Sequence, residues 1–92
     1  MFSKREHWYV EIILSKAAIK ALRALPSRDA MALQDKLRQF AAAPFEPHGF
    51  VKAMTGGGVR LRHGDWRATL VIHVAKNVIF VTEIGHRREI YR

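Results

Sequence analysis

The spacing of apolar residues changes near residue 58, and this change constrains the fold more than any other feature of the sequence. In the first half, one segment repeats apolar residues three or four positions apart, which is the spacing of one helix face. These residues are Ala30, Leu33, Leu37 and Phe40. Polar residues between them, such as Lys36, are expected to face water. From residue 59 to residue 74, apolar and polar side chains instead alternate, as in strands with one buried face.

Turn and capping residues divide this pattern into elements of an α+β fold. Ser15 can cap a first helix, Pro26 ends it, and Ser27 can cap the second. In chain order we expect a strand at 8–14, a helix at 17–25, a second helix after residue 27, an irregular loop at 44–58, and strands at 59–62, 66–74 and 78–84. An N-terminal strand and a two-helix hairpin thus precede a three-stranded antiparallel meander, with the helices on one face of the sheet.

The composition excludes several functional classes. With 49% hydrophobic residues among 92, the chain can bury a core, and at this length residues 1–92 are expected to form one domain. It has no cysteine, which excludes disulfides, zinc–thiolate sites and thiol nucleophiles. No apolar run approaches the roughly 18 residues of a membrane span, and the N-terminus does not resemble a signal peptide. We therefore expect a cytoplasmic protein without a membrane partner.

The chain is strongly basic: 16 Lys and Arg residues against eight Asp and Glu give a net charge of +8. This charge indicates a polyanionic partner, either nucleic acid or an acidic protein. Arg60 and Arg62 alternate with apolar residues on one predicted strand, and Arg67 takes a polar position on the next. If the apolar positions pack on the helices, these arginines share the other face of the sheet, and Arg87 extends it. Because like charges opposite each other destabilise a sheet, this face is expected to bind an anion.

Three segments resemble one known family. They are residues 44–52, the sequence GVRLRHGDWR at 58–67 and the sequence IGHRREIY at 84–91. Together they resemble the RelE/ParE superfamily of toxins from bacterial type II toxin–antitoxin modules, and the expected order of elements is similar too. The resemblance implies a small RelE-like fold and one of two activities. RelE-like members cleave mRNA in the ribosomal A site, whereas ParE-like members use the same fold to inhibit DNA gyrase without catalysis.

The resemblance also implies which residues would act on RNA, namely Arg60, Arg67, Arg87 and Tyr91. Cleavage by a 2′-hydroxyl group needs a proton acceptor, cationic stabilisation of the phosphorane and a proton donor for the leaving oxygen. Guanidinium groups suit the second task but do not give up their protons. Tyr91 is therefore the expected proton-transfer group, with its pKa lowered by neighbouring arginines. The combination of Arg67, Arg87 and Tyr91 favours the RelE-like branch, because gyrase inhibitors do not need it.

His86 is the second choice for proton transfer, because imidazole ordinarily titrates near neutral pH. Regular strand alternation places it on the opposite face from Arg87 unless Gly85 forms a bulge. Some members of the superfamily carry a lysine two residues before Arg60, where this chain has Gly58. His86 likewise stands where a lysine follows the strand-end glycine. These departures keep the gyrase inhibitor as the alternative function.

The remaining expectations concern binding. Further basic residues expected at RNA phosphates are Arg62, Lys52 and Arg88. No histidine shows metal-ligand spacing and no acidic cluster accompanies them, so we expect neither metal nor cofactor. The implied partners are the ribosome and mRNA, an acidic antitoxin that covers the basic face, and operator DNA only through the antitoxin complex. In the alternative reading the target is gyrase. The expected location is the bacterial cytoplasm.

Overall fold

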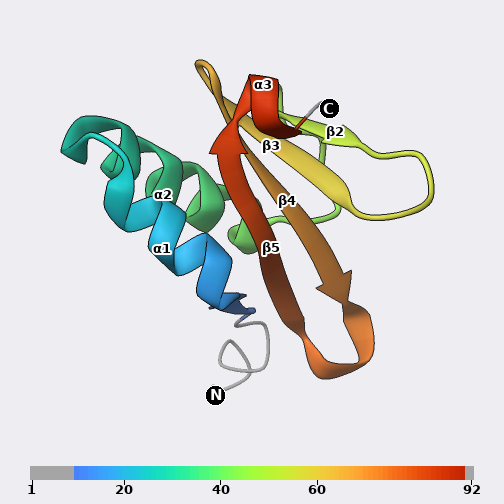
Figure 1. The fold of residues 1–92 in the computed structure, drawn as a ribbon. Coiled ribbons are helices and arrows are strands. Elements are labelled where there is room, and N and C mark those ends of the chain that lie inside the picture. The colour runs from blue at the N-terminus through green and yellow to red at the C-terminus, as the bar shows by residue number, and fades with distance from the viewer. Residues whose placement is uncertain (1–9, 91–92) are drawn as a thin grey trace.

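The computed structural model describes residues 10–90 (Figure 1). In chain order the elements are β1 (Glu11–Leu14), α1 (Lys16–Ala24), α2 (Ser27–Ala42), β2 (Val51–Ala53), β3 (Val59–His63), β4 (Trp66–His73), the 3-10 turn η2 (Val74–Lys76), β5 (Val78–His86) and α3 (Arg87–Ile90). The predicted N-terminal strand, helix hairpin and meander are all present. Residues 8 and 9 of the predicted first strand lie outside the described residues.

The strands form one mixed sheet in the order β1-β5-β4-β3-β2. Strands β3, β4 and β5 make the predicted antiparallel meander, and β1 pairs with β5 in parallel. Helices α1 and α2 lie together on one face of this sheet, as predicted (Figure 1). These two helices leave the other face of the sheet uncovered (Figure 1). No helix within residues 10–90 is long and apolar enough to cross a bilayer.

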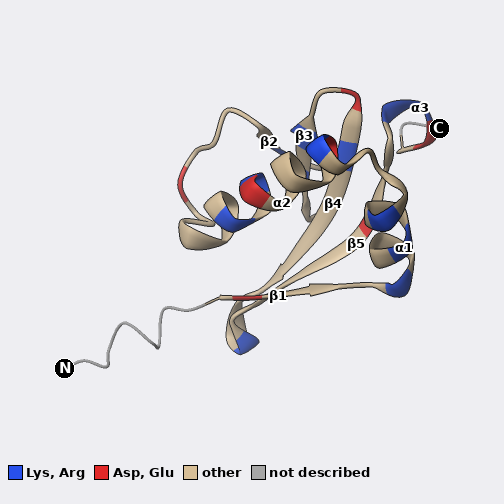
Figure 2. Ribbon diagram, turned by 90° about the vertical axis from the view of Figure 1, so that its left-hand side faces the viewer, with Lys and Arg blue, Asp and Glu red and all other residues tan. Residues whose placement is uncertain are grey.

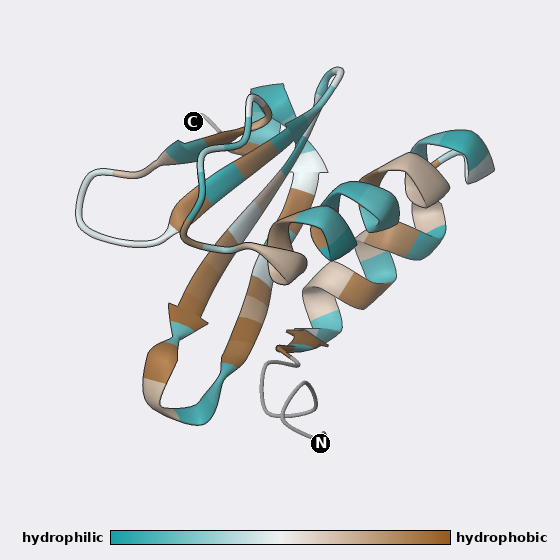
Figure 3. Ribbon diagram, turned by 180° about the vertical axis from the view of Figure 1, so that it is seen from behind, coloured by the Kyte–Doolittle hydropathy of each residue, from teal (hydrophilic) through white to brown (hydrophobic). Residues whose placement is uncertain are grey.

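The core lies between the two helices and the sheet. Leu33 and Phe40 from the predicted helix stripe are almost completely buried, and from the sheet Leu61, Leu70 and Val81 are buried to the same extent. Figure 3 shows hydrophobic and hydrophilic positions alternating along β3, which is the pattern of a strand with one covered face. The burial of one side of each strand therefore decides which side chains point away from the helices.

The two helix starts differ in how they are capped. The Ser15 hydroxyl accepts the backbone N–H of Ala18 at 3.0 Å, so the predicted cap of α1 is confirmed. The predicted cap of α2 by Ser27 is wrong, because Pro26 occupies the N-cap and no side chain caps this helix. The Pro26 carbonyl accepts the N–H of Ala30 at 2.9 Å and thereby starts the helix one residue earlier. Proline suits this place because it has no backbone N–H to satisfy.

Residues 44–58, expected to be irregular throughout, contain the edge strand β2. Three residue pairs join β2 to β3, with Lys52 directly opposite Arg60. A three-residue strand is too short to show an alternating pattern, and its backbone is paired on one side alone. The turn that follows contains Gly56, Gly57 and Gly58, all with positive φ angles, a conformation that other residues rarely adopt.

A bulge interrupts β5 directly after its apolar residues 78–81. Thr69 of β4 pairs with Glu83, but the next residue, Leu70, pairs with Val81, which leaves Thr82 as the extra residue. The insertion shifts the alternation of β5 by one position, so Val81 and Ile84 both face the core. Beyond the bulge, Glu83 pairs with Thr69 and Gly85 with Arg67, so these two residues of β5 lie on the same face as Arg67.

Candidate functional site

Basic side chains gather on the open face of the sheet. Arg60 stands opposite Lys52 of β2, and Arg62 stands opposite Arg67 of β4. Leu61, between the two β3 arginines, is completely buried, so alternation along the strand turns Arg60 and Arg62 away from the helices. We call Lys52, Arg60, Arg62 and Arg67 the cationic face; Figure 2 shows basic positions on this part of the sheet.

The cationic face borders a hollow of about 300 Å³. One wall is the segment 49–52, which leads from α2 into β2, and the other consists of Arg60, Arg62 and Arg67. Both cross-strand pairs here, Lys52–Arg60 and Arg62–Arg67, oppose like charges, an arrangement that destabilises a sheet by itself. An anion in the hollow would offset this repulsion. The structure therefore brings Arg60, Arg62 and Arg67 to one face, as predicted, and Lys52, which was expected in a loop, joins them.

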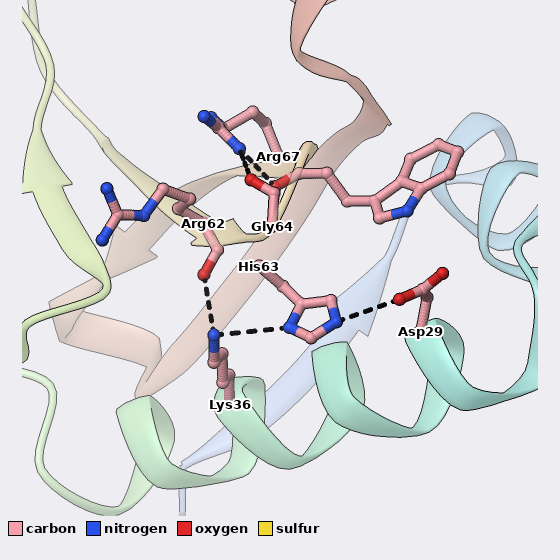
Figure 4. Close-up of polar contacts among 7 residues, drawn as sticks. Asp29, Lys36, Arg62, His63, Gly64 and Arg67 are labelled. Atoms are coloured by element: carbon pink, nitrogen blue, oxygen red, sulfur yellow. Dashed lines mark hydrogen bonds and ion pairs between the residues drawn. The ribbon is translucent and has the colours of Figure 1, made fainter.

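Arg67 differs from the other cations because only 8% of it is exposed. Its Nη1 donates to the carbonyl of Gly64 at 2.6 Å and to that of Trp66 at 3.0 Å (Figure 4). These bonds fix the guanidinium group against the turn between β3 and β4. A charged group held in this way does not have to reorganise when a ligand binds.

Helix α3 folds over the cationic side of β5. Gly85 lies opposite Arg67, and a side chain at this glycine would meet Glu89 of α3, with its Cβ 3.1 Å from Oε1. Arg87, the first residue of α3, places its Nε 3.5 Å from Asp65 Oδ1 and donates its backbone N–H to the Asp65 carbonyl at 2.7 Å. Arg87 and Arg88 are exposed and do not line the hollow. The structure therefore places Arg87 beside the β3–β4 turn, outside the hollow that Arg60, Arg62 and Arg67 line.

His86 points away from the cationic face. It pairs with Trp66, and their rings meet edge to face with centroids 5.5 Å apart, on the side of the sheet that carries the core. Its Nδ1 accepts the backbone N–H of Arg88 at 3.2 Å, while Glu89 Oε1 accepts the backbone N–H of His86 at 3.2 Å. These reciprocal bonds have the form of a capping box at the start of α3, with histidine in the usual place of serine or threonine.

Two further positions bear on the predicted site. Tyr91, the expected proton-transfer residue, lies outside the described residues. Gly58 has φ +80°, and a Cβ built on it would stand 2.8 Å from the carbonyl oxygen of Leu70. Such a contact is too short for any side chain, so this backbone cannot hold the lysine that some members of the superfamily carry here.

A polar chain behind the cationic face was not expected from the sequence. His63 Nε2 lies 3.1 Å from Asp29 Oδ1, and Lys36 Nζ lies 3.4 Å from His63 Nδ1 and 3.2 Å from the Arg62 carbonyl (Figure 4). Lys36 is half-buried, so the expectation that it faces water is wrong. The long side chain allows its ammonium group to reach β3 although its Cα lies on the flank of α2. Among residues 10–90, no three His, Cys, Asp or Glu side chains are grouped closely enough to hold a metal ion.

The sequence of residues 12–91 matches the model of one protein family, described as the ParE toxin of the type II toxin–antitoxin system parDE. The chain belongs to this ParE toxin family. The match covers most of the sequence and includes the whole cationic face. No curated protein matches the chain by sequence.

Solved structures of related toxins share the fold of this ParE-family chain. RelE in the RelE–RelB complex from Pyrococcus horikoshii OT3 is 21% identical, with a TM-score of 0.71 over 86% of this chain and 96% of that chain. The isolated RelE toxin of E. coli is 22% identical, with a TM-score of 0.71 over 89% and 90%. The YoeB/ParE toxin from Agrobacterium tumefaciens is 13% identical, with a TM-score of 0.72 over 84% and 98%. The RelE-like fold expected from the sequence is thus confirmed.

Proposed function

We propose that this type II toxin binds RNA on its cationic face and cleaves mRNA on the ribosome. The observation that supports this proposal best is the convergence of Lys52, Arg60, Arg62 and Arg67 on one hollow of the open sheet face. Guanidinium groups bind phosphate oxygens through paired N–H donors, and a cationic groove is the usual means of holding a single strand. The ribosome is itself polyanionic, which favours the approach of a chain with a net charge of +8. A toxin of this kind acts in the cytoplasm.

The chemistry would be attack of a 2′-hydroxyl oxygen on the adjacent phosphorus, which displaces the 5′-oxygen of the next nucleotide. Arg60 and Arg67 would stabilise the charged phosphorane, and Arg67 is already held in place by the β3–β4 turn. Arg62, Lys52 and the exposed Arg88 would bind neighbouring phosphates. Tyr91 remains the proposed proton-transfer residue. The capping role of His86 and its place beside Trp66 make the imidazole a weaker candidate for that task.

Inhibition of DNA gyrase is the second candidate, and two observations favour it. The matching family model is described by the ParE toxin, and Gly58 cannot hold the lysine that some RelE-like members carry. In this case the cationic face would bind without catalysis. Arg87 would then have a structural role through Asp65.

One experiment separates the two candidates. The toxin is added to a reconstituted translation reaction, the mRNA is mapped by primer extension, and gyrase supercoiling is measured in parallel. We expect cuts that require the ribosome and an unchanged rate of supercoiling. Arg62→Ala should abolish the cuts, whereas Arg38→Ala, which removes the same charge from an exposed position on α2, should retain them. Inhibited supercoiling without cuts would establish the gyrase alternative instead.

We also propose a cognate antitoxin with an acidic, amphipathic segment, by analogy with the RelE–RelB complexes. Beyond the cationic face, the open side of the sheet carries an apolar row in which Ile13 of β1 stands opposite Phe80 of β5, and Phe80 opposite Val71 of β4. These three residues are between 36% and 46% exposed. A single segment with acidic and apolar side chains could cover both parts of the face. Phe80→Ser should then weaken antitoxin binding in a pull-down assay and leave mRNA cleavage intact.

A further inference from the structure

Lys36 contacts both walls of the hollow without lining it. In the β3 wall, the carbonyl of Arg62 accepts a hydrogen bond from Lys36 Nζ at 3.2 Å. In the other wall, the centre of the Phe50 ring lies 5.5 Å from the same Nζ. The backbone N–H of Arg62 in turn donates to the Phe50 carbonyl at 2.8 Å. One side chain of α2 therefore contacts both segments that form the hollow; Figure 4 shows its bonds to the Arg62 carbonyl and to His63.

The ammonium group of Lys36 is engaged on the helix side of β3. It has three N–H donors, and three groups surround it: the Arg62 carbonyl, His63 Nδ1 at 3.4 Å and the face of Phe50. A phosphate in the hollow would have to compete with all three. Lys36 is therefore suited to hold the site in place, whereas Lys52, which lines the hollow, is suited to bind the ligand.

The imidazole of His63 is held in an orientation that accepts from Lys36. Its Nε2 faces Asp29 Oδ1 at 3.1 Å, so a proton on Nε2 leaves Nδ1 free to accept. Asp29 and Lys36 are seven residues apart on α2, which places them two turns apart on the same helix face. His63 fits between them and ties the end of β3 to the helix.

The Phe50 wall has a second attachment to α2. His48 lies between the rings of Phe40 and Phe50, with centroid distances of 5.7 and 5.3 Å, and its Nε2 is 2.8 Å from the Ala43 carbonyl. This attachment fixes the segment before β2, but it does not reach β3. Lys36 reaches both Phe50 and Arg62 from α2, in addition to the direct backbone bond between those two residues.

We propose that Lys36 is a positioning residue, which holds Arg62 and the Phe50 ring in place against α2 so that the cationic face binds RNA. This inference rests on the proposed RNA-binding function. It predicts that loss of Lys36 weakens binding through geometry, without the loss of a phosphate contact.

The dependence of RNA affinity on salt distinguishes these two effects. Binding of a labelled single-stranded RNA oligonucleotide to the full chain is measured over a range of salt concentrations. Loss of one phosphate contact makes the slope of log K against log salt less steep by about 0.7 on a single strand. Arg62→Met should show this change. Lys36→Met should keep the wild-type slope and bind about tenfold more weakly at every salt concentration, equivalent to about 1.4 kcal/mol. Lys20→Met, which removes the same charge from an exposed position on α1, is the matched control.

The outcomes separate the inference from the function on which it rests. If Arg62→Met and Lys52→Met both leave the slope unchanged, the cationic face does not bind RNA and the proposed function is overturned. If Arg62→Met makes the slope less steep but Lys36→Met binds RNA as tightly as the Lys20→Met control, the positioning role is overturned. A less steep slope in Lys36→Met would also overturn the positioning role, because Lys36 would then contact phosphate directly.

A second measurement on the wild-type chain does not depend on the folding of any variant. Lysine acetylation is followed by mass spectrometry with and without the same RNA. We expect RNA to protect Lys52, and we expect Lys36 to react slowly at a rate that RNA does not change. Protection of Lys36 by RNA, or fast acetylation of Lys36 in the free chain, would contradict the engaged ammonium group.

Discussion

Arg62 and Arg67 are cross-strand partners of like charge, yet their environments differ. Arg62 is exposed, whereas Arg67 is buried and donates to two carbonyls of the β3–β4 turn. The same residue type therefore serves two purposes within one pair. Arg67 contributes to the stability of the hairpin as well as to the charge of the hollow, and Arg62 contributes chiefly to the charge.

Replacement of Arg67 should destabilise the fold. Arg67→Ala removes two hydrogen bonds from a charged donor and leaves the Gly64 and Trp66 carbonyls without this partner. We expect the free energy of unfolding to fall by about 2–3 kcal/mol, as is usual for such bonds. Urea denaturation followed by circular dichroism measures this change, with Arg62→Ala as the exposed control. Equal stability of the two variants would contradict a structural role for Arg67.

Reversal of the charge at Arg62 should separate stability from function. Arg62→Glu turns a repulsive cross-strand pair into an attractive one, which should raise the free energy of unfolding by about 0.2–1 kcal/mol. The same change should abolish mRNA cleavage, because a carboxylate repels phosphate. Denaturation midpoints and primer extension on the same preparation test both parts. An Arg62→Glu variant that is less stable than the wild type would show that the repulsion is already relieved within the chain.

A side chain at residue 58 should be tolerated worse than one at residue 56. Both glycines have positive φ angles, but a Cβ at Gly56 meets nothing within 4 Å, whereas at Gly58 it stands 2.8 Å from the Leu70 carbonyl. We expect Gly56→Ala to cost about 1 kcal/mol from backbone conformation alone, and Gly58→Ala to cost about 1–3 kcal/mol more. Thermal unfolding of the two variants provides the comparison. Equal costs would mean that the β2–β3 turn can adjust, and that a lysine at this position is sterically possible.

The cap of α3 can be tested at His86. His86→Ala removes the acceptor for the Arg88 N–H and should lower the free energy of unfolding by about 1 kcal/mol. Asparagine is a favoured N-cap residue, so His86→Asn should recover most of that loss. Denaturation curves of the alanine and asparagine variants measure both changes in the free energy of unfolding. Cleavage assays on the asparagine variant then show whether the imidazole has a second role: a stable variant without activity would restore His86 as a proton-transfer group.

Much of the fold follows from local patterns in the sequence. The spacing of Leu33 and Leu37 predicts the buried stripe of α2, because residues three or four apart share a helix face. Alternation along residues 59–63 predicts that Arg60 and Arg62 point away from the core, because every second side chain of a strand shares a face. These features need no knowledge of distant residues. For this reason the α+β fold and most of the cationic face could be predicted.

Other features depend on contacts between segments that are far apart in the chain. The bulge at Thr82 and the pairing of the three residues of β2 with β3 are decided by neighbouring strands. Arg87 was expected among the other arginines, but α3 turns it towards Asp65. No periodicity in the sequence carries this information, because a short segment takes its conformation from the surface on which it packs.

The sequence by itself determined the two long helices and the strands of the meander, which sides of them are apolar, and that the arginines of β3 and β4 share a face. Only the tertiary structure decided that the ammonium group of Lys36 contacts Arg62, His63 and Phe50 behind that face instead of facing solvent. The reason is that periodicity fixes the direction of a side chain relative to its own helix or strand. The distance between that side chain and another element is decided by how the helix packs on the sheet.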